Sequence, residues 1–102
     1  MTIDTIKALI EAKAVKWTTH CLEKMGERDI CIEDVKLCIL NGEIIEEYPN
    51  DFPYPSCLIY GIGLNNKIIH TVVGSDGISA YMITAYIPTT VKFEDDLKTR
   101  RK

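Results

Sequence analysis

The sequence lacks any apolar run near the roughly 20 residues that a membrane-spanning helix needs. Its apolar runs are short and soon interrupted, as at Cys38–Leu40. The chain also begins, at Met1–Asp4, with an acid where a secretory signal would carry basic residues and then an apolar stretch. We therefore expect a cytoplasmic protein that has no contact with a membrane.

An excess of positive charge is missing as well. The 102 residues hold 12 Lys and Arg against 15 Asp and Glu, a formal net charge of −3. Because affinity for nucleic acids comes mainly from neutralised phosphates, a general basic nucleic-acid-binding protein is disfavoured. A short basic tail covers residues 97–102. It is either a local anion site or, as we expect, a solvated and frayed terminus.

The cysteines show no spacing typical of a metal site. Cys21, Cys31, Cys38 and Cys57 form no Cys-x-x-Cys pair and no tight grouping with histidine. Each stands among apolar residues, and free cysteine is one of the residue types most often buried. We expect reduced, packed cysteines, and neither a metal nor another cofactor.

The apolar spacing predicts helices first and strands afterwards. With 46% hydrophobic residues, the chain can bury a core as a single domain over residues 1–102. Helical periodicity covers residues 3–14, 18–27 and 32–40, with Thr2 and Thr18 as N-caps and Trp17 as a break. Strand-like segments follow at residues 44–48, 58–62, 67–73 and 79–87. Short turns join the last three, so the sequence indicates an α+β fold with a four-stranded antiparallel sheet.

The second predicted helix carries a cationic stripe. At about 100° per residue, His20, Lys24 and Arg28 lie within an arc of roughly 80°, beside the apolar face of that helix. Such a stripe suits an anionic ligand where the helix meets the sheet. The alternative is an ordinary surface helix, in which the Lys and Arg heads pair with nearby glutamates such as Glu27.

Two further groups of residues are candidates for function. His70 falls in the middle of a predicted strand, and Tyr86 shares one face of the last strand with Thr84. Each could equally be a hydrogen-bonded residue of the sheet. Phe52 and Tyr54 stand in a proline-rich loop, where they could stack on a base or a partner, or pin the loop to the domain.

Several blocks together resemble one bacterial family. From His20 the sequence has a basic residue and Met four and five positions later, Arg eight positions later, and then Ile and Asp-Val. This pattern resembles domain of unknown function 4258. Later blocks fit it in the same order, at Asn41–Ile45, Pro55–Leu58, Ile69–Val72 and Ile83–Pro88. The resemblance covers about residues 17–90 and leaves an extra N-terminal helix, 3–14, and the tail outside.

Three residues depart from the family pattern. Lys24 stands where Arg is more frequent, which keeps the charge but loses the two-pronged donor geometry. Asp29 replaces a usual Gly, and Cys31 replaces a usual Ser at a helix N-cap, which should weaken that cap.

The family is similar to RelE, BrnT and MqsR toxins, and this similarity implies a candidate activity. It implies helices packed on a curved antiparallel sheet, as in RelE, and a ribonuclease that needs no metal and that an antitoxin inhibits. By this resemblance His20, His70 and Tyr86 would be catalytic, since histidine can act as base or acid near neutral pH. Lys24 and Arg28 would bind the phosphate through charge-assisted hydrogen bonds.

The acidic balance keeps two other functions open. The sequence pI is about 5.3, which is low for a protein that acts on RNA. One alternative is a non-catalytic protein-binding module of the same fold, which would use its edge strands and the loop with Phe52 and Tyr54. The other is a binder of a different small anionic ligand at the same cationic stripe.

Overall fold

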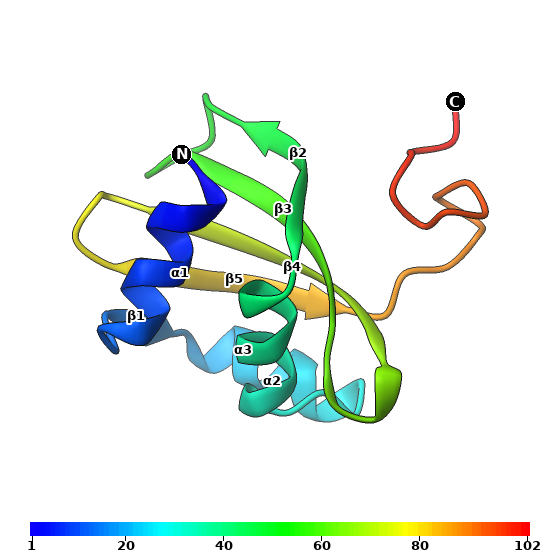
Figure 1. Ribbon diagram of the computed structural model, residues 1–102, viewed down its shortest axis with the longest axis horizontal. Helices are drawn as coiled ribbons and strands as arrows, with labels where there is room; N and C mark the ends of the chain where they lie inside the picture. Colours follow the sequence, from blue (N-terminus) through cyan, green and yellow to red (C-terminus); the bar gives the residue numbers. More distant parts are fainter.

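Helices cover one face of a five-stranded mixed sheet in the computed structural model, which describes residues 1–102 (Figure 1). The helices are α1 (Ile3–Glu11), α2 (Thr19–Glu27) and α3 (Ile32–Leu40), and a 3₁₀ turn, η1, spans Leu64–Asn66. The strands are β1 (Val15–Trp17), β2 (Glu43–Tyr48), β3 (Ser56–Ile62), β4 (Ile68–Ser75) and β5 (Ala80–Tyr86). None of these helices has the length and apolar character needed to cross a membrane.

The sheet confirms the α+β class and corrects the prediction of four antiparallel strands. The order is β1-β5-β4-β3-β2, and β2 to β5 form the predicted antiparallel meander. The fifth strand, β1, pairs in parallel with β5 from Val15↔Ala80 to Trp17↔Met82. From the sequence Trp17 is a break between helices, because a strand of three residues is too short to show alternation. Only the pairing with β5 makes it a strand.

Helices α1 and α2 begin at the predicted N-caps, whereas the start of α3 is held by a different side chain. Thr2 and Thr18 each accept a backbone hydrogen bond, from Thr5 and Cys21 respectively. At the start of α3 the Asp34 carboxylate accepts the N–H of Cys31 at 2.9 Å. Cys31 itself is exposed, which corrects the prediction that every cysteine is packed, whereas the other three thiols are buried and free.

The core lies between the helices and the sheet. Its fully buried members on the helices include Ile6, Met25, Val35 and Ile39, and those on the strands include Ile59, Ile69 and Val73. Helix α3 lies directly against β3. The two backbones are so close that a Cβ at Gly61 would overlap the backbone carbonyl of Cys38. This close contact fixes the sheet relative to the helices.

The C-terminal segment, residues 89–101, is packed and is not the frayed terminus that the sequence suggested. In Figure 1 this segment, orange to red, lies across the sheet from α1. Phe93 is 1% exposed, Lys98 pairs with Glu43 of β2 at 2.9 Å, and Arg100 pairs with Glu46. One buried aromatic ring and two ion pairs therefore hold the segment on the face of the sheet that the helices leave free.

Candidate functional site

His70 is buried on the sheet face opposite the helices. Alternation along β4 sends Ile69 and Val73 into the helix-side core and His70 to the other face. Its Nε2 lies 2.6 Å from the carbonyl oxygen of Leu97, and its Nδ1 lies 3.2 Å from the hydroxyl of Tyr86. Because a carbonyl only accepts, Nε2 carries the proton, and Nδ1 of the neutral ring accepts from the Tyr86 hydroxyl.

The surroundings of His70 favour its neutral form. The rings of Phe93, Tyr86 and Tyr60 lie edge-on to it, with centroids at 4.6, 5.3 and 6.0 Å. Burial lowers the pKa of His70, although the bond to Leu97 and the charge of Glu46 act in the opposite direction. Burial also raises the pKa of Tyr86. The pair is therefore an uncharged imidazole and a protonated phenol at neutral pH.

Arg28 connects helix α2 to the same end of the sheet. It caps the C-terminus of α2, and its Nη1 donates to the Thr84 hydroxyl at 3.2 Å and to the Ala85 carbonyl at 2.9 Å. Both acceptors lie on β5, immediately before Tyr86. Because Nη1 alone makes these bonds, the donors on Nε and Nη2 remain available for a ligand.

These elements surround one cleft of about 390 Å³. It is lined by Arg28, Tyr86, Lys92, Phe93, Arg100 and the segment Ile87–Thr89; we call it the cationic cleft. Arg100 is held by Glu46 through two hydrogen bonds of 3.0 and 3.1 Å and lies over the Phe93 ring. Neither Arg28 nor Lys92 is paired with an acid. The cleft therefore carries two uncompensated cations beside Tyr86, which suits a phosphate-sized anion.

The structure brings three of the five predicted site residues together. Arg28 and Tyr86 line the cationic cleft, and His70 lies directly behind Tyr86. Lys24 is outside the lining and pairs with Glu27 at 3.2 Å. His20 is exposed at the start of α2, about 12 Å of helix rise from Arg28.

The C-terminal segment supplies site residues that the sequence does not predict. Lys92 and Arg100 line the cationic cleft, Phe93 covers His70, and Leu97 fixes its tautomer. The only signal was the density of basic residues near the end of the chain, which does not reveal where that segment packs.

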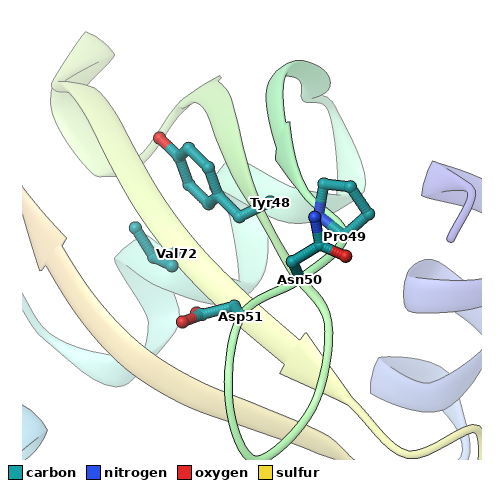
Figure 2. A pocket seen from close by; sticks show the side chains of 5 residues that line it. All are labelled: Tyr48, Pro49, Asn50, Asp51 and Val72. Atoms are coloured by element: carbon teal, nitrogen blue, oxygen red, sulfur yellow. The ribbon is translucent and has the colours of Figure 1, made fainter.

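A second hollow, of about 540 Å³, lies on the same sheet face (Figure 2). Figure 2 shows the side chains of Tyr48, Val72 and Asp51 in a row, with Pro49 set away from them. Burial and the neighbouring Glu46 carboxylate raise the pKa of Tyr48 to about 12. The charged group in this hollow is an acid, Asp51, so it does not suit an anion.

The fold and the site define a small α+β protein with a cationic cleft beside a histidine–tyrosine pair. No group of three or more His, Cys, Asp or Glu side chains is placed to hold a metal ion. The model of the family described as Domain of unknown function (DUF4258) matches residues 17–87, and the chain belongs to this family. No curated protein and no solved structure matches the chain. The matched part contains Arg28, His70 and Tyr86, whereas Lys92 and Arg100 lie beyond it.

Proposed function

We propose that this protein is a metal-independent ribonuclease, similar to the RelE, BrnT and MqsR toxins, which cleaves RNA at the cationic cleft. One observation carries the proposal: Tyr86, hydrogen-bonded to the buried His70 behind it, lines a cleft that also holds two unpaired cations, Arg28 and Lys92. A base next to an anion site is the arrangement that RNA cleavage by its own 2′-hydroxyl requires.

The chemistry begins with a proton relay. The RNA 2′-hydroxyl gives its proton to the Tyr86 oxygen while the Tyr86 proton passes to Nδ1 of His70, whose Nε2–H remains bonded to Leu97. The 2′-oxygen then attacks the adjacent phosphorus, and the bond from phosphorus to the 5′-oxygen breaks. Water supplies the proton to the leaving 5′-oxygen, and the hydroxide that this leaves takes back, through Tyr86, the proton that His70 received. The products are a 2′,3′-cyclic phosphate and a 5′-hydroxyl, and both residues return to their starting forms.

The cations stabilise the charge that builds on the phosphate during this step. Arg28 is held by Thr84 and Ala85, so its free donors need no reorganisation when the charge develops. Lys92 adds a second positive charge from the C-terminal segment. Lys24 and His20, farther along α2, would contact neighbouring phosphates of the same strand.

Cleavage of a mixed-sequence RNA in excess EDTA tests the proposal. The wild type should give products that end in a cyclic phosphate, and Lys92→Ala should slow the reaction by about tenfold or more. Lys16→Ala is the matched control, because Lys16 is an exposed lysine on β1 with no ion pair. Intact RNA with the folded wild type, or equal rates for both lysine variants, would contradict the assignment.

A protein-binding module is the second candidate, and the sheet order favours it. β2 and β1 are the two edges of the sheet, and alternate residues of β2 direct backbone groups outward, where no strand lies beside them. A strand of an antitoxin-like partner could extend the sheet there. A complex that survives gel filtration while RNA remains uncut would support this function over the ribonuclease.

The cationic cleft also fits a smaller phosphorylated ligand. A nucleoside monophosphate that raises the melting temperature of the wild type, but not of Arg28→Ala, would indicate this function if RNA is left intact.

A further inference from the structure

An aromatic hollow lies toward the other end of β5 from the cationic cleft. It has a volume of about 270 Å³, and its lining includes Phe52, Tyr54, Gly74, Tyr81 and Ile83; we call it the aromatic hollow. It shares no lining residue with the cationic cleft. Its walls are mainly apolar, in contrast to the charged walls of the cleft.

The hollow and the cleft open on the same face of the sheet. His70 and Gly74 lie on one face of β4, and their partners on β5 are Tyr86 and Tyr81. Those two tyrosines are five positions apart, an odd number, so regular alternation would send them to opposite faces. However, Val72 pairs with Thr84 and Val73 pairs with Met82, so a β-bulge adds one residue to β5 between the two tyrosines. Both tyrosines therefore point to the same face of the sheet. Tyr81 and Tyr86 are paired with residues four positions apart on β4, so they lie about 13 Å apart along one side of β5.

The side chains of the hollow form a flat apolar surface, and an exposed aromatic ring stands at its edge. Tyr54 and Tyr81 stack with centroids 5.0 Å apart and ring planes at 20°. The Ile83 side chain extends over Gly74: a Cβ added to Gly74 would lie 3.3 Å from Cδ1 of Ile83. Phe52 stands at the rim and is 90% exposed. A large aromatic side chain that is almost fully exposed beside an apolar hollow is suited to cover a planar ligand.

The charges at the hollow select the base of a nucleotide over its phosphate. The Asp76 carboxylate accepts the hydroxyl hydrogen of Tyr81 at 2.9 Å, and Asp51 accepts the backbone N–H of Phe52 at 3.0 Å. Two carboxylates at the edge repel a phosphate, and carboxylate oxygens can accept from the amino groups of a base. The cationic cleft has the opposite charge and, in the proposed function, takes the phosphate of the nucleotide.

We propose that the aromatic hollow binds a base of the single-stranded RNA whose phosphate lies in the cationic cleft, with the strand running along β5. The inference rests on the proposed function and gives its substrate class, single-stranded RNA. Stacking of bases on aromatic side chains of a sheet, combined with phosphate contacts, is how proteins bind single strands without reading a long sequence. The half-buried Thr84 lies on β5 between Tyr81 and Tyr86.

The test measures binding separately from cleavage. The probe is a short single-stranded RNA with 2′-O-methyl groups, which lacks the attacking hydroxyl, and a fluorescent dye at one end; a second probe has the same backbone without bases. Phe52→Ala should weaken binding of the first probe by about tenfold, the size of one stack, and leave the second unchanged. Ile78→Ala is the matched control, because Ile78 is 76% exposed and lies outside the hollow. Its affinity should equal that of the wild type.

The variants distinguish failure of the hollow from failure of the cleft. If Arg28→Ala weakens both probes but Phe52→Ala weakens neither, the hollow does not bind a base and the cleft stands. If Phe52→Ala weakens the first probe but Arg28→Ala has no effect, the hollow binds a base and the proposed phosphate site is wrong. If the folded wild type binds neither probe, both proposals are overturned, and a protein segment becomes the better candidate for the hollow.

Discussion

The Tyr86 hydroxyl lies 3.2 Å from Nδ1 of His70, and the two residues are direct partners across β4 and β5. Both side chains therefore project from two paired strands and not from loops, so their separation is fixed by the strand pairing. The remaining ring nitrogen of His70 is bonded to Leu97, which belongs to the C-terminal segment. The tautomer that allows Nδ1 to accept a proton thus depends on a part of the chain outside the family match.

Tyr86→Phe removes the hydroxyl of this pair and keeps the ring. We expect it to slow RNA cleavage by about 100-fold, the usual contribution of a positioned acid or base, with little change in fold. Tyr60→Phe is the matched control, because Tyr60 also neighbours His70 but its hydroxyl makes no hydrogen bond. Single-turnover rates of both variants measure the effect. Equal rates would show that the Tyr86 hydroxyl takes no part in the reaction.

Stability should fall as pH decreases from 7 to 5.5. The pKa of His70 is lowered by burial from its ordinary value of 6.5, so the unfolded chain binds a proton before the folded one does. Stability therefore rises with pH in this window and is lost below the unfolded pKa. We expect the melting temperature of the wild type to drop by a few degrees. His20→Gln should retain this drop and His70→Gln should lose it, whereas the reverse result would assign the effect to His20.

Two glycines with opposite surroundings test the contact between α3 and β3. Gly61→Ala places a Cβ against the Cys38 carbonyl, and we expect a loss of about 1–3 kcal/mol in the free energy of unfolding. Gly26 is its matched control, because it lies in α2 with nothing within 4 Å of the added Cβ. Gly26→Ala should gain up to about 1 kcal/mol from helix propensity. Urea denaturation of both variants gives the two values, and a neutral Gly61→Ala would contradict the close contact.

The sequence predicted the elements well because their signals are local. Caps at Thr2 and Thr18 and the alternation of the later strands need only neighbouring residues, and the structure confirms them. β1 was missed because its identity depends on β5, far away in the sequence. The α+β class followed from the order of elements alone, whereas the position of the fifth strand did not.

The candidate site could be predicted only in part, for the same reason. His70, Tyr86 and Arg28 are marked by residue type and by the family pattern, but no periodicity shows that a ladder joins the first two or that Arg28 reaches β5. Lys92 and Phe93 follow Pro88 in a segment without regular structure. Their packing depends on His70 and on the glutamates of β2, so it was not visible in their own stretch of sequence.

The ionised carboxylate of Asp34 should stabilise the folded protein. Burial alone raises its pKa, but hydrogen bonds from Cys31 N–H, the Lys67 ammonium and Leu64 N–H outweigh burial and lower it to about 2. Because the folded pKa is below the unfolded value of 3.8, this stabilisation is complete above about pH 4 and is lost as the pH falls toward 2.

Asp34→Asn should therefore lower the melting temperature by several degrees at pH 7. The difference from the wild type should shrink when both proteins are measured near pH 3. Asp95→Asn is the control, because its side chain is 98% exposed, and we expect no change at either pH. A difference between Asp34→Asn and wild type that grows with acid would contradict the pKa direction.

Phe93 should control how deeply His70 is buried. Its ring lies edge-on to the imidazole at 4.6 Å and is 1% exposed, so Phe93→Ala opens the cover over His70 to water. Burial is the largest influence on the pKa of His70 and lowers it. Hydration should therefore raise that pKa toward its ordinary value, and an NMR titration of the imidazole protons measures the change.

The C-terminal segment should also become easier to cut by protease in Phe93→Ala, while the core remains folded, because the core contacts among α1–α3 and the sheet do not include Phe93. Val91→Ala is the matched control, since Val91 is 81% exposed in the same segment, and it should change neither property. If the pKa of His70 stays lowered in Phe93→Ala, the β-sheet and its tyrosines alone exclude water from the ring. The segment would then supply Lys92 to the cationic cleft without shielding the histidine.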